Sequence, residues 1–334
     1  MSAPVLQVKG LRVEYPTRKG VVHAVAGISF DVAAGEIVAL VGESGCGKSA
    51  TAHSLLRLIA APGRVPAGEV WFDGEDLLKV SDARIRQIRG NRIAMVFQEP
   101  MSSLNPVQRI GDQVAEPLRQ HKLASAAQAW QRAAELLARV NIPDPKARLH
   151  DYPHQFSGGM RQRVMIAAAM ACSPRLIIAD EPTTALDVTV QAQIIELLRT
   201  AVQADATGLL LITHNLGVVA RYADRVNVMY GGEIIESASA DELYAAPQHP
   251  YTRGLLNSVP SLSQRSGERL VPIAGQPFDA LNRPSGCSFH PRCPAALARC
   301  RQEAPPTVRI GATHQASCWL PLQQLASGAS VCSN

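Results

Sequence analysis

Hydrophobic residues follow two different spacings along this chain, and each spacing predicts a different element. Alternating apolar and polar residues at 5–13 and 22–32 predict two strands of an antiparallel sheet. Unbroken apolar runs at Val38–Val41, Leu176–Ala179 and Leu209–Ile212 predict strands that are buried on both faces. The chain therefore combines an antiparallel sheet near its start with deeply buried strands further along.

Helical spacing dominates the middle of the chain. Apolar residues recur every three or four positions from 110 to about 172, apart from a proline-bounded break at 143–153. A further helical pattern runs from Val190 to Val202, and a shorter one runs from Lys48 to Ile59. Strands that alternate with helices in this way predict an α/β fold.

Turn residues delimit the remaining elements. A strand at 69–74 ends in Asp-Gly, another covers 91–98, and a Gly-Gly turn joins two strands within 226–236. Residues 240–258 are predicted to be helical, whereas 259–334 are rich in Pro, Ser, Gly and Cys. That change of composition predicts a small, loop-rich C-terminal domain that needs a staple to fold.

Composition excludes several classes of protein. The 334 residues are 46% hydrophobic and 18% charged, which is ordinary for a soluble globular protein. No apolar run approaches the roughly 20 residues of a membrane span, and the N-terminus lacks the features of a signal peptide. The net charge of +5 comes without a cluster of Lys and Arg, so we expect no nucleic-acid partner. We expect a cytosolic protein that reaches a membrane only through partners.

The segment Gly42–Ser49 carries the most informative motif. It reads Gly-Glu-Ser-Gly-Cys-Gly-Lys-Ser and matches G-x-x-x-x-G-K-[ST] between a buried strand and a helix. Its glycines let backbone N–H groups face phosphate oxygens, and the helix adds its positive dipole end. Lys48 then places a charge on the outer phosphates, and the Ser49 hydroxyl can bind Mg²⁺. The expected ATP-binding residues here are Gly42, Glu43, Ser44, Gly45, Cys46, Gly47, Lys48, Ser49 and Ala50.

Polar residues end three other strands. Asp180 and Glu181 follow Leu176–Ala179, at a strand end where one carboxylate can hold Mg²⁺ and another can orient or deprotonate water. Neighbouring strand residues point to opposite faces, so we assign Asp180 to the metal and Glu181 to the water. Gln98 and His214 stand at the exits of two further strands.

Two helix starts and one aromatic residue complete the candidate set. Ser157-Gly-Gly opens a helix with Ser157 as its N-cap, and this arrangement exposes N–H groups to an anion. Asp187 leads into the helix that contains Val190. Tyr15 follows the first strand, where an aromatic ring can stack on a nucleobase, although a surface tyrosine beside Pro16 is the simpler interpretation of that residue alone.

Together these residues resemble the ATP-binding subunit of ABC transporters. Seven motifs occur in the order typical of that family: the A-loop aromatic (Tyr15), Walker A (Gly42–Ser49), the Q-loop (Gln98), the signature (Phe156–Met160), Walker B (Leu176–Asp180), the D-loop (Thr184–Asp187) and the switch histidine (His214). The resemblance implies an α/β fold with a P-loop ABC ATPase core. In that core, a RecA-like subdomain with an antiparallel β entrance carries an inserted helical subdomain at about 99–172. It also implies a division into an ATPase domain at 5–258 and a small Cys-rich domain at 259–334.

A narrower resemblance covers nearly the whole chain. The runs 152–163 and 179–193, together with His249–Thr252 and the C-terminal cysteines, resemble importers of dipeptides and oligopeptides. Met160, where many ABC proteins carry Gln, resembles the D-type of the two ATPase subunits in that group. Asn215 replaces the commoner Asp and removes no reacting group. The cargo stays open between peptides and the nickel, haem or glutathione that related importers carry.

The resemblance also implies the partners and the division of roles. Two ATPase subunits, expected to be different chains, face each other head to tail on two transmembrane permease subunits, with an external peptide-binding protein acting indirectly. The expected location is the cytoplasmic face of the inner (plasma) membrane. The implied roles are catalysis by Glu181, His214 and Lys48, magnesium binding by Ser49, Gln98 and Asp180, and contact with the partner's nucleotide by Ser157, Gly158, Gly159 and Asp187.

Two other functions fit parts of the sequence. An ABC ATPase acting on nucleic acid predicts a long coiled-coil insertion or a second ATPase copy, and the sequence contains neither. A regulator that binds metal and uses nucleotide only as a switch would not need Glu181, the carboxylate that activates water.

Four cysteines in the C-terminal region predict a metal centre. Cys287, Cys293, Cys300 and Cys318 have the spacing C-x5-C-x6-C-x17-C. Four thiolates can hold a [4Fe–4S] cluster or a tetrahedral zinc ion, and zinc sites usually show the tight C-x2-4-C pairs that are missing here. This spacing and the resemblance to peptide importers, whose ATPases carry such clusters, together favour a cluster with a structural role, with zinc as the first alternative and free thiols as the second. We expect the nearby His290 and His314 to be solvated.

Overall fold

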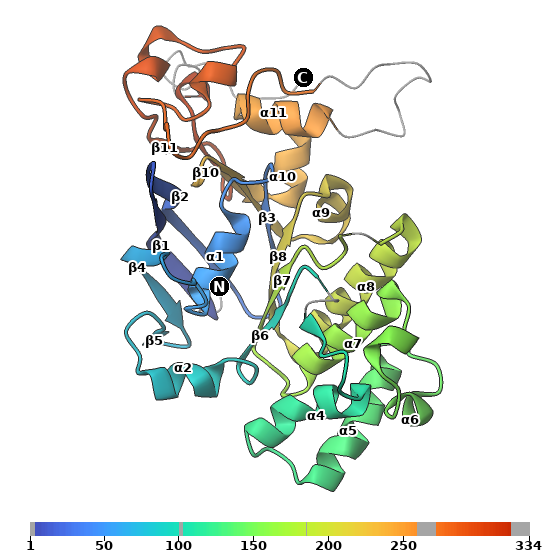
Figure 1. Cartoon of the computed structure of the whole chain (residues 1–334). Coiled ribbons are helices and arrows are strands. Elements are labelled where there is room, and N and C mark those ends of the chain that lie inside the picture. Colours follow the sequence, from blue (N-terminus) through green and yellow to red (C-terminus); the bar gives the residue numbers. More distant parts are fainter. Residues whose placement is uncertain (1–3, 100–102, 185, 259–271, 322–334) are drawn as a thin grey trace. The chain divides into compact units, whose positions relative to one another are not determined.

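The computed structural model describes residues 4–99, 103–184, 186–258 and 272–321. The chain divides into two compact units, and each contains strands and helices (Figure 1). Unit 1 comprises residues up to 6, 31–37 and 71–212, and unit 2 comprises 7–30, 38–70 and 213 onward.

Parallel strands form the centre of unit 1. Its strands β6 (Ile93–Val96), β7 (Leu176–Asp180) and β8 (Gly208–Thr213) lie side by side in that order. Every residue of β7 and β8 is buried, which explains why their sequences are unbroken apolar runs. The predicted Asp73-Gly74 turn also occurs, with both residues at positive φ, and it joins β4 (Arg64–Phe72) to β5 (Glu75–Asp76).

The predicted helical region is confirmed in unit 1. Helices α4 (Ile110–Gln120), α5 (Ala126–Arg139) and α7 (Gly158–Met170) pack against one another (Figure 1). Ser125 and Gln128 form a capping box that starts α5. Among the described residues of the unit, the other helical elements are α2 (Asp82–Ile88), α6 (Pro145–Arg148), η1 (Pro153–Gln155) and α8 (Val188–Asp205).

Unit 2 contains two groups of strands. Strands β2 (Gly20–Val32), β1 (Leu6–Thr17) and β4 are neighbours in one sheet. In the other group, β3 (Ile37–Val41) pairs in parallel with β9 (Arg225–Tyr230), and β9 pairs antiparallel with β10 (Glu233–Ser239) across the predicted Gly231-Gly232 turn. The helical elements in the described part of the unit are α1 (Lys48–Leu55), α9 (Leu216–Tyr222), α10 (Ala240–Ala245), α11 (Pro250–Asn257), η2 (His290–Arg292) and η3 (Ala298–Arg301).

Two predicted element ends are wrong. Strand β1 continues to Thr17, so Tyr15 lies within the strand rather than after it. Helix α1 ends at Leu55 instead of continuing toward Ile59, because Arg57 adopts a positive φ of 53° and the Leu58 N–H group donates back to the His53 carbonyl. This hydrogen bond from Leu58 to His53 ends the helix, and the Leu58 side chain is 37% exposed.

The C-terminal region described at 272–321, called here the cysteine-rich segment, adds strands to the sheet of unit 2. Strand β12 (Gln315–Ser317) pairs antiparallel with β10, and β11 (Thr307–Arg309) pairs with β12. The segment therefore extends the edge of the sheet that begins at β3. The predicted boundary between residues 258 and 259 stays a prediction.

A buried carboxylate stabilises the edge of the sheet to which these strands are added. Glu236 of β10 is 1% exposed and accepts hydrogen bonds from the backbone N–H groups of Gln248 and His249. It also lies 2.7 Å from Nε2 of His314, which is itself 5% exposed. The expectation that His314 is solvated is therefore wrong, because a carboxylate removed from water needs partners from the chain.

Lowering the pH should reduce the stability of the fold of unit 2, because His249 is buried in its neutral form. This side chain is 1% exposed and caps α11 by accepting from the Tyr251 N–H group. Burial lowers its pKa from 6.5 to about 4, opposed by Glu236 and assisted by Arg253. Between those values the unfolded chain binds a proton that the folded chain excludes, so stability is retained above the unfolded pKa and falls as pH decreases. From about pH 7.5 to about pH 5 the loss is about 2 kcal/mol.

The matched variant is His249→Asn, because asparagine keeps a capping acceptor and does not titrate. Denaturant midpoints at both pH values should show a smaller pH dependence in the variant than in the wild type. Equal pH dependence in the two proteins would mean that His249 is not the titrating group.

Candidate functional site

The phosphate loop is confined by neighbouring backbone. Within unit 2 it connects β3, which is buried along its whole length, to α1. A Cβ atom on Gly42 would lie 2.3 Å from the Met229 carbonyl oxygen, and one on Gly47 would lie 2.2 Å from the Ala24 carbonyl oxygen. Gly47 also has a φ of 106°, in the region that favours glycine. These two glycines are thus required by space as well as by the curl of the loop.

Lys48 points back into its own loop. Its side chain is buried, and its ammonium donates to the carbonyl oxygens of Gly42 at 2.8 Å and Glu43 at 3.0 Å. The positive charge is therefore held within the curve of the loop, at the start of α1, whose first residues follow Gly47 without a side-chain cap. A buried cation beside an uncapped helix start is the arrangement that favours bound phosphate.

Cys46 of the loop and Thr51 of α1 have structural contacts. Cys46 is buried, and burial raises the pKa of its thiol, so the residue stays a neutral packing group. The Gly232 N–H group donates to the Cys46 carbonyl, which ties the loop to the β9–β10 turn. Thr51 of α1 returns two hydrogen bonds to the Gly47 carbonyl, one from its N–H group and one from its hydroxyl.

Glu43 has partners that the sequence did not reveal. Its carboxylate forms a two-pronged ion pair with Arg292, with Nη1 to Oε2 at 2.7 Å and Nη2 to Oε1 at 3.1 Å. Its backbone N–H group donates to the Tyr251 hydroxyl at 2.9 Å. The cysteine-rich segment thus contacts the phosphate loop directly, although 249 residues separate the ion pair. Only the Glu43 position within the motif offered a signal, since a carboxylate in an anion-binding loop calls for a countercharge.

Unit 1 brings two predicted residues together. Gln98, which follows β6, donates through Nε2 to Glu181 Oε2 at 3.0 Å, and the Thr184 hydroxyl donates to the same oxygen at 2.8 Å. Glu181 follows Asp180, the buried last residue of β7, and adopts a positive φ of 46°. A non-glycine residue in that conformation carries strain, which marks Glu181 as a candidate functional residue.

The signature and the D-loop also lie close together in unit 1. Ser157 is the N-cap of α7, as predicted, and accepts from the Met160 N–H group. Asp187 caps α8 in the same way. A Cβ atom on Gly159 would lie 2.8 Å from the Val190 side chain, so the two helix starts touch. Ser157, Gly158 and Asp187 are exposed and face away from the core of their unit.

Tyr15 and His214 belong to unit 2. Tyr15 is half-buried, with its ring against Gly63, where an added Cβ would approach it to 2.6 Å. His214 is exposed and follows β8, and the next residue, Asn215, accepts from the Val218 N–H group as the N-cap of α9. Asparagine at this position therefore serves as a helix cap.

Comparisons with known proteins relate most of the chain to peptide transporters. Residues 25–184 match the model of the ABC transporter family, and residues 235–300 match the oligopeptide/dipeptide transporter C-terminal region. The dipeptide transport ATP-binding protein DppD of Bacillus subtilis is 48% identical over 96% of both chains. A probable peptide ABC transporter ATP-binding protein of Sinorhizobium fredii is 49% identical over 94% of both chains.

The chain belongs to the ABC transporter family of ATP-binding proteins. Among solved structures, it resembles a dimeric post-hydrolysis state of the ATP-binding cassette MJ0796 bound to ADP and phosphate, with a TM-score of 0.64 and 27% identity. That likeness covers 70% of this chain and 98% of the cassette. The family inferred from the motifs is therefore confirmed, together with the α/β ABC ATPase fold.

The predicted metal centre has less support than the ABC motifs. Cys287, Cys293, Cys300 and Cys318 are free thiols, and those of Cys287, Cys293 and Cys318 have pKa values raised by burial, that of Cys318 to about 11. The other three thiols lie close enough to Cys318 to contribute to its raised pKa. Within the described residues, however, no group of three or more His, Cys, Asp or Glu side chains is arranged to hold a metal ion. The expected cluster is therefore not supported by the geometry.

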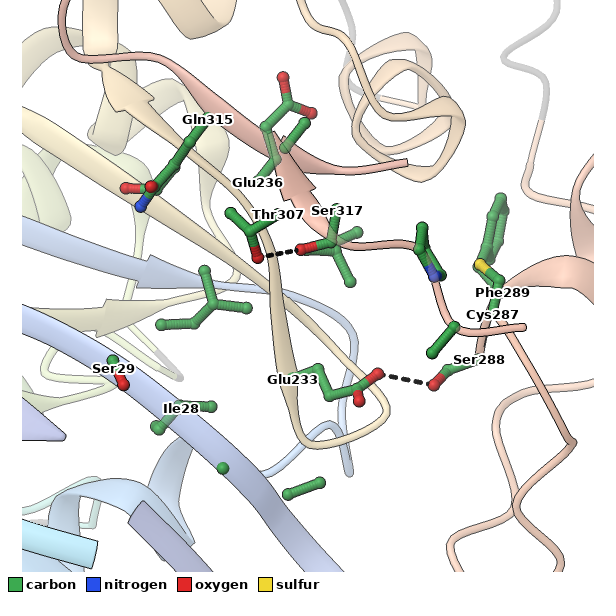
Figure 2. Close-up of a pocket in the computed structure, with 18 of the residues that line it drawn as sticks. Ile28, Ser29, Glu233, Glu236, Cys287, Ser288, Phe289, Thr307, Gln315 and Ser317 are labelled. Carbon is green, nitrogen blue, oxygen red and sulfur yellow. Dashed lines mark hydrogen bonds between the residues drawn. The ribbon is translucent and has the colours of Figure 1, made fainter. Parts of the chain in front are cut away.

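A cavity of about 340 Å³ lies elsewhere in unit 2 (Figure 2). Its lining comes from β2, β10 and the C-terminal segment, and it includes no residue of the phosphate loop. Two hydrogen bonds cross the lining, one from Ser288 to Glu233 at 2.8 Å and one between Thr307 and Ser317 at 2.9 Å.

No helix in the described part of the chain is long and apolar enough to cross a membrane.

Replacing Gly47 with Ala should destabilise the nucleotide-free protein more than replacing Gly45 with Ala. Both glycines have positive φ, so each alanine costs about 1–2 kcal/mol in backbone strain. Only at Gly47 would the methyl group meet backbone, the Ala24 carbonyl, whereas nothing lies within 4 Å at Gly45. Denaturant unfolding midpoints measure the difference, and equal losses would show that the loop shifts freely to admit a side chain.

Proposed function

We propose that this chain is the ATP-hydrolysing subunit that powers an ABC importer of dipeptides or oligopeptides. The observation that carries the proposal is the formed phosphate loop, in which the buried Lys48 ammonium donates to the Gly42 carbonyl and neighbouring backbone leaves no room for a side chain at Gly42 or Gly47. The cargo is supported by full-length relatives named for dipeptide and oligopeptide transport and by the matching C-terminal region. The alternative is that the same kind of ATPase subunit powers an importer of nickel, haem or glutathione.

Residues of the loop would bind the ATP phosphates. The Lys48 ammonium supplies the charge, and the backbone of Gly42–Ala50 supplies N–H groups. Tyr15 would stack on the base. The hydroxyl of Ser49, the amide oxygen of Gln98 and the carboxylate of Asp180 are the hard oxygen donors that suit Mg²⁺, which would neutralise charge on the phosphates.

Glu181 would act on the attacking water. Its carboxylate is held by Thr184 and Gln98, so its orientation is set by two residues from different parts of unit 1. A carboxylate held in this way can orient the water and accept its proton, and His214 would stabilise the γ-phosphate. Gln98 would link this carboxylate to the helical region, through which closure of the subunit pair would reach the permeases.

The proposed assembly is a pair of ATPase subunits on two permease subunits at the cytoplasmic face of the membrane. Exposed Ser157, Gly158 and Asp187 support a role at the partner's nucleotide, since a surface that binds another subunit must be accessible. Gly159 lies beside them. The resemblance to D-type subunits supports a second, different ATPase chain as the partner. ATP bound across the pair would favour the closed state.

Glu181→Gln should abolish turnover while ATP binding persists. The loss in the assembled transporter, with the partner's site separately disabled, should be about 100-fold or more. Lys48→Ala is the contrasting variant, because it removes the loop charge and should weaken ATP binding itself. Equilibrium binding and phosphate release measure the two effects. Normal turnover by Glu181→Gln would overturn the assigned role of the carboxylate.

We propose further that Cys287, Cys293, Cys300 and Cys318 hold a [4Fe–4S] cluster, with zinc as the alternative. Support comes from the donor set, which is four free thiols near one another in a segment whose strands, among its described residues, are three residues long. When bound, such a centre supplies folding free energy to the segment.

Metal analysis tests this second proposal. Protein purified without oxygen should contain about four iron and four sulfide per chain, as a [4Fe–4S] cluster requires. Cys300→Ser should lose the metal, whereas Cys172→Ser, which changes a half-buried thiol of unit 1, should keep it. One zinc without iron would replace the cluster by the alternative, and a wild-type chain without any metal would remove the site.

A further inference from the structure

The proposed mechanism of ATP hydrolysis makes no use of the contact between Arg292 and the phosphate loop. Arg292 lies in η2, directly before Cys293, and its side chain is 6% exposed. Both of its terminal nitrogens bond to the Glu43 carboxylate, one residue after the start of the loop. A two-pronged pair of this kind fixes orientation as well as charge.

Arg292 is itself held rigidly by its surroundings. Its Nε donates to the Ala274 carbonyl at 3.1 Å, and Nη2 also donates to the Ile273 carbonyl at 3.3 Å. The guanidinium lies over the Tyr230 ring at 5.9 Å. Because the arginine is already ordered by these contacts, holding Glu43 costs little additional side-chain entropy.

Glu43 uses all of its polar groups within the chain. Its N–H group donates to the Tyr251 hydroxyl, its carbonyl accepts from Lys48 and its carboxylate accepts from Arg292. Tyr251 is fully buried and packs against Tyr230, with ring centroids 4.7 Å apart. The start of the loop is thus anchored to a rigid aromatic cluster through both its backbone and its side chain.

The charge of Glu43 bears directly on ATP binding. A free carboxylate in the loop would repel the phosphates, which bring several negative charges to the same place. Arg292 cancels that charge and keeps the carboxylate on the side of the cysteine-rich segment. The positive charge of Lys48 then remains available to the phosphates.

We infer that Arg292 is a positioning residue for ATP binding, which the cysteine-rich segment supplies to neutralise and orient Glu43 in the phosphate loop. The inference deepens the proposed function and rests on it. It makes the C-terminal segment part of the ATP-binding machinery.

Equilibrium ATP binding to the purified full chain tests the inference. Arg292→Gln leaves the Glu43 charge uncompensated and should raise the ATP dissociation constant roughly 10-fold, an effect that decreases at high salt. Adding Glu43→Gln to this variant removes the exposed charge and should restore affinity to within about 3-fold of the wild type. Arg292→Lys keeps the charge without the fork and should fall between wild type and Arg292→Gln.

The matched control is Arg299→Gln. Arg299 also precedes a cysteine of the same segment, but it lies over Trp319 and pairs with the exposed Glu303. This variant should bind ATP as the wild type does. In the assembled transporter, Arg292→Gln should raise the KM for ATP and leave kcat within about 2-fold, since only uniform binding of ATP is weakened.

Two results would overturn the inference. One is unchanged ATP affinity in Arg292→Gln, and the other is a loss of affinity that Glu43→Gln does not reverse, because Arg292 would then serve packing alone. If Arg292→Gln does not fold, the doubly neutral variant decides, since it leaves no unpaired charge at this contact, and a 10-fold loss of affinity in it contradicts the inference. A wild-type chain that fails to bind ATP would remove the proposed function as well, which distinguishes the two failures.

Discussion

Close packing of backbone around the phosphate loop is the constraint on which unit 2 depends. The Met229 carbonyl leaves no room for a side chain at Gly42, the Ala24 carbonyl leaves none at Gly47, and the Gly232 N–H group donates to the Cys46 carbonyl. Strand β2 and the β9–β10 turn therefore shape the loop from outside. A loop whose conformation is set by its neighbours loses little entropy when it binds phosphate.

The C-terminal segment continues the same confinement. Phe289 stacks edge-on against Tyr230 and Tyr251, with ring centroids 5.1 Å and 5.3 Å away, and Tyr251 receives the Glu43 N–H group. The segment also supplies β12 to the edge of β10. What looks in sequence like a separate cysteine-rich appendage is therefore joined to the ATPase by aromatic packing, an added strand and the Arg292–Glu43 pair.

In unit 1, strain and hydrogen bonding define the candidate catalytic carboxylate. Glu181 keeps its unfavourable backbone conformation because its N–H group bonds to the Ile212 carbonyl and its carbonyl accepts from the Thr184 N–H group. The same turn places Thr184 on the carboxylate, and Gln98 reaches it from the neighbouring strand. The backbone strain is thus offset by bonds that also aim the side chain.

The sequence by itself determined the features that depend on neighbouring residues. Apolar runs located β3, β7 and β8, glycine spacing located the phosphate loop, and the capping role of Ser157 was correct, because periodicity and capping act over a few positions. Only the tertiary structure decided which charges meet. Glu43 pairs with Arg292 over 249 residues and Glu236 with His314 over 78. Burying a charge is tolerated only beside its partner, and folding, rather than local spacing, brings the two together.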